Sequence, residues 1–378
     1  MARPLLSAAL IVRDEERFLE ACLRSLLGRV DEIVVVDTGS TDRSREIAGD
    51  LGARLLQFRW IDDFAAARNA AVDASTGQWV LYIDADERVV EFDRADADRL
   101  LAARDHACYT VLFRPQSGFT RYREHRIFRN RPELRFRGVI HESLIPALDE
   151  LVAREGVRVG ASSIGLEHDG YDGDIQHKYS RNLPLLEKRL AQDPAHVYSW
   201  AHLGATLLGI GDAEGAERAW RRGIDIVRSR AAATAADDLP YLHLSNFLLE
   251  RRRDATEVLD EACRRFPDNY ALLWLRARAL VVAARYSEAI PLFARLAAID
   301  PDALCDGPMA FDRSIFGANA HAALGLCAFR LGIYDQSAAH YARAETMAPG
   351  DIGIRAKRAL AEGRANDAAA SRRALARR

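Results

Sequence analysis

The stretch Trp79-Val-Leu-Tyr-Ile-Asp84-Ala85-Asp86-Glu87 runs from an apolar pattern directly into acidic residues. Its apolar run predicts a buried strand, which would place the carboxylates of Asp84 and Asp86 at the carboxyl edge of a sheet. Carboxylate oxygens suit Mg²⁺ or Mn²⁺, and such an ion commonly completes its shell with phosphate oxygens of a substrate. A metal site at the sheet edge is therefore one interpretation of this stretch, but the triplet alone is weak evidence for it, because acidic clusters are common on protein surfaces.

Strand and helix patterns alternate around this stretch, from the N-terminus to about residue 90. Short β-branched runs predict strands at residues 5–12, 32–37, 53–58 and 78–84. Helical spacing predicts the intervening helices at residues 16–27, 42–51 and 64–74. This alternation predicts parallel strands with right-handed crossovers, and so an α/β sandwich of Rossmann-like type. Ligands of such sheets bind at the carboxyl ends of the strands.

The pattern changes at about residue 195, where strands vanish and a helical repeat begins. Pro267 and Pro301 lie 34 residues apart, and each follows the same frame of small and large residues. The frame occurs four times, at Trp200, Leu203-Gly204, Ala216 and Trp220; at Ala255, Leu259 and Ala262; at Ala289, Phe293 and Leu296; and at Leu324-Gly325, Ala328, Tyr341 and Ala344. This spacing is the signature of tetratricopeptide repeats, in which small residues let paired helices pack closely. Insertions at 231–238 and 302–315 predict loops.

The overall composition excludes several classes of protein. The chain has 378 residues, with 53 basic and 55 acidic side chains and a formal net charge of -2, which excludes a globally cationic nucleic-acid binder. No apolar run approaches the ~20 residues of a membrane helix. Charges at residues 13–16 stand where a signal-peptide cleavage site would be expected, and the five cysteines form no Cys-x-x-Cys pair. We therefore expect a soluble, cytoplasmic protein with no disulfide framework and no transmembrane segment.

Polar motifs follow the other predicted strands at regular positions. They read Val12-Arg-Asp14-Glu15-Glu16, Asp37-Thr-Gly-Ser-Thr-Asp42 and Trp60-Ile-Asp-Asp-Phe-Ala-Ala-Ala-Arg68-Asn69. Together with Asp84-Ala-Asp86-Glu87, they make the sequence resemble the family 2 glycosyltransferases of GT-A fold. It resembles most closely the subgroup with C-terminal tetratricopeptide repeats, and is similar to peptide or protein O- or S-glycosyltransferases. One departure is that the first motif, usually Lys/Arg-Asn-Glu in the family, reads Arg13-Asp14-Glu15.

The resemblance implies an N-terminal α/β GT-A domain followed by an all-α solenoid. We place the GT-A domain at 1–172, a linking helix at 173–194 and the tetratricopeptide-like repeats at 195–350. Residues 351–378 are rich in alanine and arginine, which predicts a capping helix with a basic tail. We expect no nucleic-acid partner, because this tail lacks interleaved aromatic residues.

The resemblance also assigns roles to residues at the strand ends. Nucleotide-sugar binding is expected at Val12, Asp14, Glu15, Asp37, Arg68, Asp84, Ala85 and Asp86. Asp37 would accept a hydrogen bond from the uracil imide, and its alternative role is a helix N-cap. Arg68 would approach uracil or diphosphate, and its alternative is a surface ion pair with Asp63. Asp84 would contact ribose or diphosphate, and Asp86 would coordinate the metal.

The middle of the chain supplies the remaining candidates. The resemblance implies an acceptor-side catalytic base, which we assign to Glu142, with His141 as the alternative because either side chain can take a proton at neutral pH. It also implies a late histidine as metal ligand, which we assign to His168; its alternative is a hydrogen-bonded loop histidine. Residues 113–137 hold eight arginines and two acids, which predicts either a positive field for the donor or a solvated loop.

We therefore expect a metal-dependent inverting hexosyltransferase. The resemblance implies transfer of a hexose or N-acetylhexosamine from a UDP-sugar, with Mn²⁺ or Mg²⁺, to a Ser, Thr or Cys side chain of a peptide or protein held by the helical repeats. A cell-envelope or other saccharide acceptor is the enzymatic alternative, and an inactive tetratricopeptide scaffold is an alternative of another class. A sugar-nucleotide pyrophosphorylase would need a glycine-rich loop where Arg13-Asp14-Glu15-Glu16 stands. A solenoid end or the amphipathic segment 178–190 offers a surface for a homodimer.

Overall fold

The structure is a computed structural model that describes residues 6–115, 117–169, 175–231, 234 and 236–376. The chain forms two compact units, the first comprising Met1–Ala219 with Cys305–Ala310, and the second Trp220–Leu304 with Phe311–Arg378. The boundary expected at residue 172 lies outside the described residues. Because the first unit runs through Ala219, it includes the helix that we expected to act as a linker at 173–194.

An eight-stranded mixed sheet forms the centre of the first unit, in the order β3-β2-β1-β4-β7-β6-β8-β5. Its strands are β1 (Leu6–Val12), β2 (Glu32–Asp37), β3 (Arg54–Gln57), β4 (Trp79–Tyr82), β5 (Glu87–Glu91), β6 (His106–Arg114), β7 (Tyr122–Arg129) and β8 (Arg158–His168). Strands β3, β2, β1 and β4 are parallel. Strand β7 lies antiparallel between β4 and β6, and β5 pairs antiparallel with β8. The carboxyl ends of β1, β2 and β4 therefore meet at one edge.

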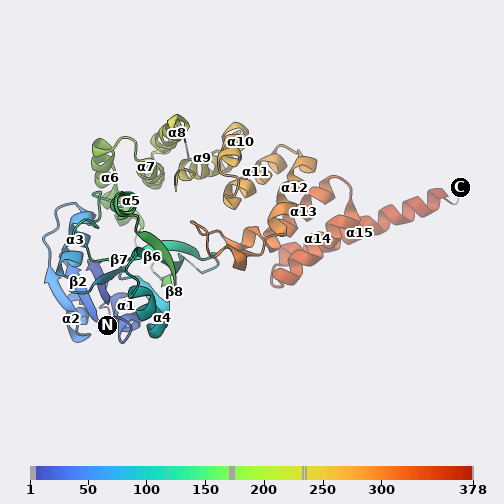
Figure 1. Ribbon diagram of the computed structural model, residues 1–378. Helices are drawn as coiled ribbons and strands as arrows, with labels where there is room; N and C mark the ends of the chain where they lie inside the picture. The colour runs from blue at the N-terminus through green and yellow to red at the C-terminus, as the bar shows by residue number, and fades with distance from the viewer. Residues whose placement is uncertain (1–5, 116, 170–174, 232–233, 235, 377–378) are drawn as a thin grey trace. The chain divides into compact units, whose positions relative to one another are not determined.

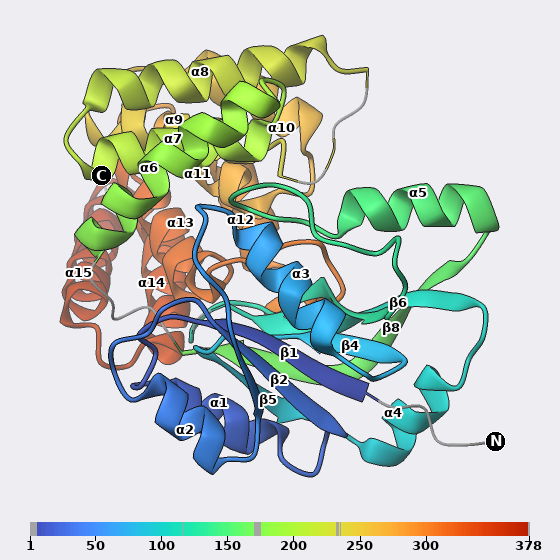
Figure 2. The same ribbon diagram turned by 90° about the vertical axis from the view of Figure 1, so that its left-hand side faces the viewer.

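Helices cover both faces of this sheet (Figures 1 and 2). On one face lie α1 (Leu19–Leu26), α2 (Ser44–Asp50) and α4 (Arg94–Leu101), and on the other α3 (Phe64–Ala74) and α5 (Ile145–Glu155). Strand β1 shows how the sequence produces two layers: Leu10 and Val12 pack with α1, while Ala9 packs with α3. Successive strand residues point to opposite faces, so an apolar run supplies both cores. The predicted α/β fold class is confirmed.

The loop after β1 is held by side chains that follow β2. The backbone N–H groups of Asp14 and Glu15 donate to Ser40 Oγ at 3.0 Å and Ser44 Oγ at 2.8 Å. These contacts shape residues 13–16 as a loop, and α1 begins at Leu19, three residues later than the helix expected from residue 16. The ends of two parallel strands are thereby fixed to each other at the edge where ligands would bind.

The rest of the described chain is mainly helical. Helices α6 (Ile175–Gln192) and α7 (Val197–Gly209) belong to the first unit, and α8 (Ala213–Ser229) crosses the boundary at residue 219. The second unit contains α9 (Leu239–Glu250), α10 (Thr256–Arg265), α11 (Tyr270–Val282), α12 (Tyr286–Ala297), η1 (Pro301–Leu304), η2 (Arg313–Ile315), α13 (Ala318–Arg330), α14 (Tyr334–Met347) and α15 (Ile352–Ala376). Consecutive helices pack in pairs, and a Cβ atom at Gly325 would lie 3.0 Å from the Tyr341 ring. This close crossing agrees with the helical repeat expected from the sequence.

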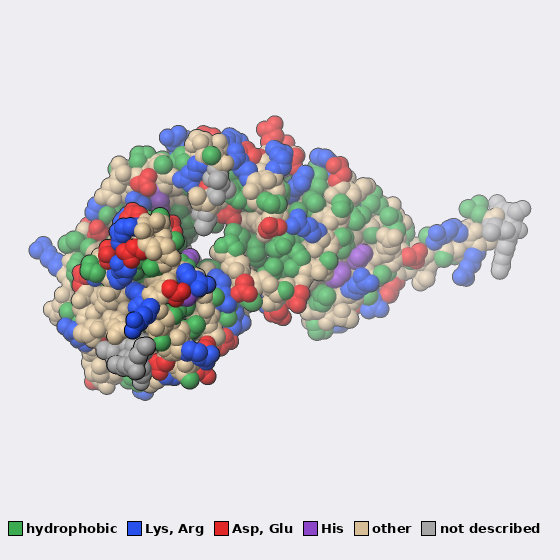
Figure 3. Space-filling view, viewed as in Figure 1, with side chains coloured by type: hydrophobic (Ala, Val, Ile, Leu, Met, Phe, Trp, Pro, Cys, Tyr) green, Lys and Arg blue, Asp and Glu red, His purple; other side chains and the backbone are tan. Residues whose placement is uncertain are grey.

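Two features of the C-terminal half complete the description. Cys305–Ala310 belongs to the first unit, where Arg123 Nε donates to Asp306 Oδ1 at 2.8 Å and Arg123 N donates to the Gly307 carbonyl at 2.9 Å. Lys and Arg side chains are spread along α15, the last helix in the space-filling view (Figure 3). Within the described part of the chain, no helix is long and apolar enough to cross a membrane.

We predict that Trp79 at the start of β4 is a main contributor to the stability of the sheet. Its side chain is fully buried, its ring packs 5.4 Å from Tyr109, and its indole N–H donates to the Leu101 carbonyl at 2.9 Å. Trp79→Ala should lower the free energy of unfolding by about 3–5 kcal/mol through the cavity it creates. Trp79→Phe, which loses the hydrogen bond but keeps a ring, should cost about 1–3 kcal/mol. Urea unfolding followed by circular dichroism checks this order, and equal losses would contradict it.

Candidate active site

A cleft of about 460 Å³ opens at the carboxyl edge of β1 and β4 in the first unit. It brings together most of the predicted site residues: Val12, Glu15, Arg68, Asp84, Ala85, Asp86, His141, Glu142 and His168. These residues come from loops after β1 and β4, from α3, from the segment before α5 and from the end of β8. The sheet topology thus brings together side chains that are spread over 157 residues of sequence, from Val12 to His168.

Two predicted residues, Asp14 and Asp37, are not among those that line the cleft. Asp37 is buried at the end of β2, and its carboxylate accepts hydrogen bonds from the backbone N–H groups of Gly39 at 3.2 Å and Ser40 at 3.0 Å. Asp14 has a left-handed φ of 54° and accepts from the Thr41 N–H at 2.6 Å. That hydrogen bond lowers the pKa of Asp14. Both carboxylates therefore shape the loop that borders the cleft.

Arg68 of α3 joins two of the candidate carboxylates. Its Nη2 donates to Asp84 Oδ1 at 2.7 Å, and its Nε donates to Glu142 Oε1. The guanidinium also lies over the rings of Tyr82 at 5.3 Å and Phe136 at 5.7 Å. Burial would raise the pKa of Asp84, but the charges of Arg68 and Arg126 and the hydrogen bond from Arg68 together keep that pKa below its usual value. The alternative partner, Asp63, instead caps α3 by accepting from Ala66 N.

Asp86 and His168 form the second pair in the cleft. Strands β5 and β8 pair with Glu87 opposite His168, and this register places His168 Nε2 3.1 Å from Asp86 Oδ2. Burial lowers the pKa of His168, but the hydrogen bond and charge of Asp86 together raise it above its ordinary value. A carboxylate oxygen and an imidazole nitrogen this close, facing a cleft, fit a divalent cation that takes its remaining ligands from water and diphosphate. Among the described residues, the cleft included, no group of three or more acidic, His or Cys side chains is placed to hold a metal ion, so this pair would supply two protein ligands.

The structure distinguishes the two candidate bases by their surroundings. The ring of His141 lies 4.3 Å from His202 and 4.8 Å from Tyr198, and its Nε2 is buried without a hydrogen-bond partner among the described residues. Burial and the neighbouring histidines and Arg189 lower the pKa of His141 to about 2. Such an imidazole is a poor proton acceptor at neutral pH. Glu142 faces the cleft beside Arg68 as a carboxylate.

Sequence reasoning missed a buried ion pair beneath this cleft. Arg126 of β7 donates to both carboxylate oxygens of Glu87, at 2.7 and 3.1 Å, and both residues are almost completely buried. Glu87 Oε2 also accepts from the backbone N–H of Asp84 at 2.9 Å. The pair therefore fixes the turn that carries Asp84 and Asp86. The arginine-rich composition of residues 113–137 was the only signal, and it did not distinguish Arg126 from its neighbours.

The remaining arginines of that segment are engaged elsewhere. Of the eight, Arg126 alone lines the cleft among the described residues. The others pair with carboxylates or carbonyls: Arg114 with Glu167, Arg121 with Glu91, Arg123 with Asp306, Arg129 with the His106 carbonyl, Arg131 with Glu155, Arg135 with Asp73 and Arg137 with Glu150. This segment therefore stabilises the first unit through ion pairs more than it supplies charge to the cleft.

The sheet with helices on both faces and carboxylates at its carboxyl edge has the architecture of a GT-A fold. Residues 7–146 match the glycosyl transferase family 2. The chain therefore contains a family 2 glycosyltransferase domain, and the resemblance noted in the sequence is confirmed for this region. The matched range includes Asp84, Asp86 and Glu142, whereas His168 lies beyond it.

The curated relatives cover more of the chain. A TPR repeat-containing protein of Synechococcus elongatus is 38% identical over 254 residues, which is 65% of this chain and 62% of that protein. The SPbeta prophage-derived glycosyltransferase SunS of Bacillus subtilis is 25% identical over 200 residues, 50% of this chain and 46% of that protein. This chain thus spans less than two thirds of the length of either relative. Glucosyl-3-phosphoglycerate synthase from Mycobacterium tuberculosis, a solved structure, is 18% identical, with a TM-score of 0.36 over 50% of this chain and 79% of that one.

We predict that Arg126 and Glu87 contribute to stability as a unit. Arg126→Met should lower the free energy of unfolding by about 3–5 kcal/mol, because it leaves the buried Glu87 carboxylate without its counter-charge. Glu87→Gln keeps an acceptor for Asp84 N, and the double variant should be more stable than the sum of the single losses by about 0.5–3 kcal/mol. A double-mutant cycle by urea unfolding measures this difference. Simple additivity would show that the pair is not coupled.

We also predict a pH dependence from Glu15, which lies in the cleft near Asp86. Burial and the charge of Asp86 raise its pKa from 4.5 to about 7. Between those values the folded state binds more protons than the unfolded state, so this residue makes the protein less stable as pH rises from 4.5 to 7. Glu15→Gln removes that loss, and its stability relative to the wild type should grow across this range. Urea unfolding in the presence of a chelator at pH 4.5, 6 and 7.5 measures this difference in the free energy of unfolding. The exposed Glu16→Gln is the control, and its difference from the wild type should stay constant across these pH values.

Proposed function

We propose that this protein is a metal-dependent inverting glycosyltransferase that transfers a hexose or N-acetylhexosamine from a UDP-sugar to a Ser, Thr or Cys side chain of a peptide or protein. The observation that carries the proposal is one cleft that holds two adjoining pairs, Asp86 with His168 and Arg68 with Glu142. The first pair suits a cation and a diphosphate, and the second offers a carboxylate to an acceptor. Membership of residues 7–146 in glycosyl transferase family 2 supports this reading.

Glu142 is the proposed general base. Its carboxylate takes the proton from the acceptor O–H or S–H while the acceptor atom forms a bond to the anomeric carbon. The bond from that carbon to the β-phosphate oxygen breaks, and its electron pair leaves with UDP. Arg68 positions the carboxylate through a charge-assisted hydrogen bond from its Nε. The low pKa of His141 is the reason to prefer Glu142.

Asp86 and His168 are the proposed ligands of Mn²⁺ or Mg²⁺. When bound, the cation supplies positive charge to the departing diphosphate. Asp84 would contact ribose or diphosphate beside it, held in place by Arg68 and by the N–H contact to Glu87. Val12 and Ala85 would border the nucleotide through their backbone, since both line the same cleft.

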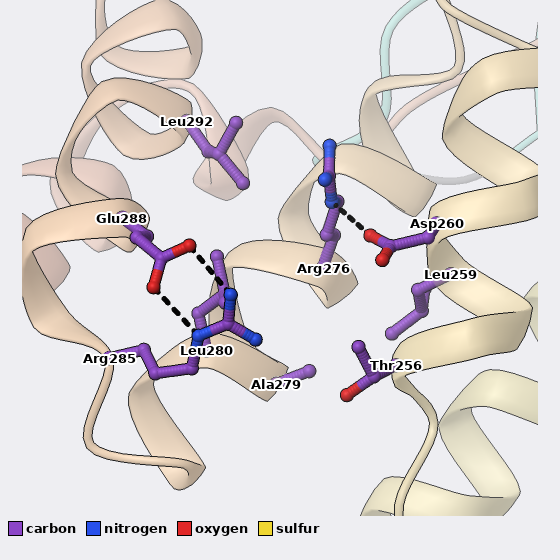
Figure 4. A pocket seen from close by; sticks show the side chains of 9 residues that line it. All are labelled: Thr256, Leu259, Asp260, Arg276, Ala279, Leu280, Arg285, Glu288 and Leu292. Carbon is purple, nitrogen blue, oxygen red and sulfur yellow. Dashed lines mark hydrogen bonds and ion pairs between the residues drawn. The ribbon is translucent and has the colours of Figure 1, made fainter.

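A polypeptide is the proposed acceptor because helical repeat arrays commonly bind extended peptides. In the second unit, a pocket of about 110 Å³ lies between α10, α11 and α12 (Figure 4). Arg276 Nε pairs there with Asp260 Oδ1 at 2.8 Å, and Arg285 pairs with Glu288 at 2.6 Å. Leu259 and Leu280 line the same pocket. Charged groups can form hydrogen bonds with the backbone of a peptide, and the neighbouring apolar side chains can pack against its side chains.

The proposal predicts separate effects for the two pairs. Asp86→Ala should reduce metal-dependent turnover at least ~100-fold, because the diphosphate loses its bound cation. Glu142→Gln should keep nucleotide binding but slow transfer ~10²–10⁴-fold, because the amide cannot take the proton. A panel of UDP-sugars with Mn²⁺ and candidate peptides, followed by intact mass, measures both. The exposed Asp50→Ala is the matched control and should retain wild-type turnover.

The outcomes distinguish the alternatives. A sugar-sized mass increase on a peptide supports the proposal, whereas transfer confined to saccharides would establish the other acceptor class. An Asp86→Ala variant with unchanged turnover would overturn the site assignment. A wild-type protein that binds no UDP in the presence of Mn²⁺ by calorimetry would instead indicate a scaffold.

A further inference from the structure

The helix expected to act as a linker contributes directly to the cleft. Lys178, Arg181 and Asn182 of α6 all line it, together with the candidate donor-site residues. Positions i, i+3 and i+4 lie on one face of a helix, so a single orientation of α6 presents all three side chains. None of the three was among the predicted site residues.

The position of α6 against the transferase domain is set by an apolar contact. Leu185, Leu186 and Leu190 are buried in a cluster that includes Val139 and Ile140. Those two residues shortly precede Glu142 in the sequence. The helix therefore packs on the same segment that carries the candidate base. Burial of these leucine side chains stabilises the packing of α6 on that segment by about a few kcal/mol.

Two other arginines that line the cleft, Arg68 and Arg126, already form ion pairs with carboxylates. Arg68 pairs with Asp84 and Glu142, and Arg126 pairs with Glu87 and Glu124. In contrast, among the described residues no ion pair joins Lys178 or Arg181 to a carboxylate, and the Nε of Arg181 donates to Asn182 Oδ1 at 3.1 Å. These two cations, called the α6 cations below, are thus available to an incoming anion.

The α6 cations, the candidate metal ligands and Glu15 all line the same cleft. Glu15 experiences all of these charges: Asp84 and Asp86 raise its pKa, while Lys178 and Arg181 lower it. An anion near Glu15 and the metal pair would therefore lie within reach of the α6 cations. A cation on one side and two basic side chains on the other can match the charges of a diphosphate.

Arg181 is oriented by an aromatic contact. Its guanidinium lies 5.4 Å from the centre of the Phe64 ring, and Phe64 is itself packed edge-on against Trp60 at 4.8 Å. The backbone N–H of Phe64 donates to the Val139 carbonyl at 2.9 Å. Partial burial lowers the pKa of Arg181, and the charge of Glu15 opposes this effect. The aromatic contact thus restricts the position of a guanidinium that remains accessible to an anion.

We propose that Lys178 and Arg181 bind the diphosphate of the nucleoside-diphosphate donor and stabilise it as it departs. The inference rests on the proposed function, since it assigns a subsite within the same cleft. As the bond between the anomeric carbon and the β-phosphate oxygen breaks, the electron pair goes to that oxygen and the negative charge of the diphosphate increases. Two cations on α6 favour this state more than the intact donor.

The test compares uridine, UMP and UDP as ligands, each with Mn²⁺, by calorimetry on the full chain. Wild-type protein should bind UDP more tightly than uridine. The double variant Lys178→Ala/Arg181→Ala should weaken UDP binding ~10- to 100-fold and leave uridine binding within about twofold, because only the phosphate contacts are lost. Its UDP affinity should also depend less on salt concentration.

Two further variants keep the test decisive. Lys188→Ala removes an exposed cation from the same helix, one whose Nζ donates to the Asp62 carbonyl at 3.1 Å outside the cleft, and should leave UDP binding unchanged. Arg181→Lys keeps the charge and should retain most of the affinity. Thermal unfolding of each variant confirms that it is folded, which is expected because both α6 cations are exposed.

The inference and the proposed function fail in different ways. Equal weakening of UDP and uridine, or unchanged UDP binding in a folded double variant, would overturn the diphosphate subsite while the glycosyltransferase proposal stands. An effect confined to the acceptor KM would assign the α6 cations to the acceptor instead and equally overturn the inference. A wild-type protein that binds none of the three ligands would overturn both.

Discussion

The largely buried guanidinium of Arg68 connects three parts of the first unit. It reaches from α3 to Asp84 after β4 and to Glu142 before α5, and two aromatic rings exclude water around it. A charge in such a place needs its partners, because loss of either carboxylate would leave it uncompensated. Asp84 and Glu142, the carboxylates proposed for the donor side and the acceptor side, therefore share one counter-ion. Below them, Arg126 and Glu87 apply the same constraint to the turn that carries Asp86.

Local patterns were sufficient to predict the elements that lead into the cleft. Strand β2 occupies the predicted residues 32–37 and helix α3 the predicted residues 64–74, because β-branched runs and the Asp63 cap encode them directly. The repeat frame of the second half likewise follows from spacing, as the contact between Gly325 and Tyr341 illustrates. The family motifs also predicted most of the cleft residues. Each motif directly follows a strand, so its side chains lie at the carboxyl end of that strand whatever the position of the strand in the sheet.

Pairings between distant segments could not be predicted in this way. His168 lies beside Asp86 because β5 and β8 pair in one register, and Arg126 lies beneath the cleft because β7 inserts antiparallel between β4 and β6. Such registers depend on loop closure and packing of the whole sheet, which no short window of sequence contains. The contribution of Lys178 and Arg181 was hidden for a different reason, since an amphipathic helix with basic residues has the same pattern whether its polar face meets solvent or a ligand.

The inclusion of α6 and α7 in the first unit has a consequence for the modular evolution of such chains. A chain shortened at residue 172 would lose both α6 cations and would expose Val139 and Ile140, which α6 covers. A crossover at the end of β8 would remove this packing, whereas one beyond Ala219 would keep α6 and α7 but would still have to preserve the contact of Arg123 with Asp306 and Gly307. The compact first unit therefore extends past the point at which strands give way to helices, and it also takes in Cys305–Ala310.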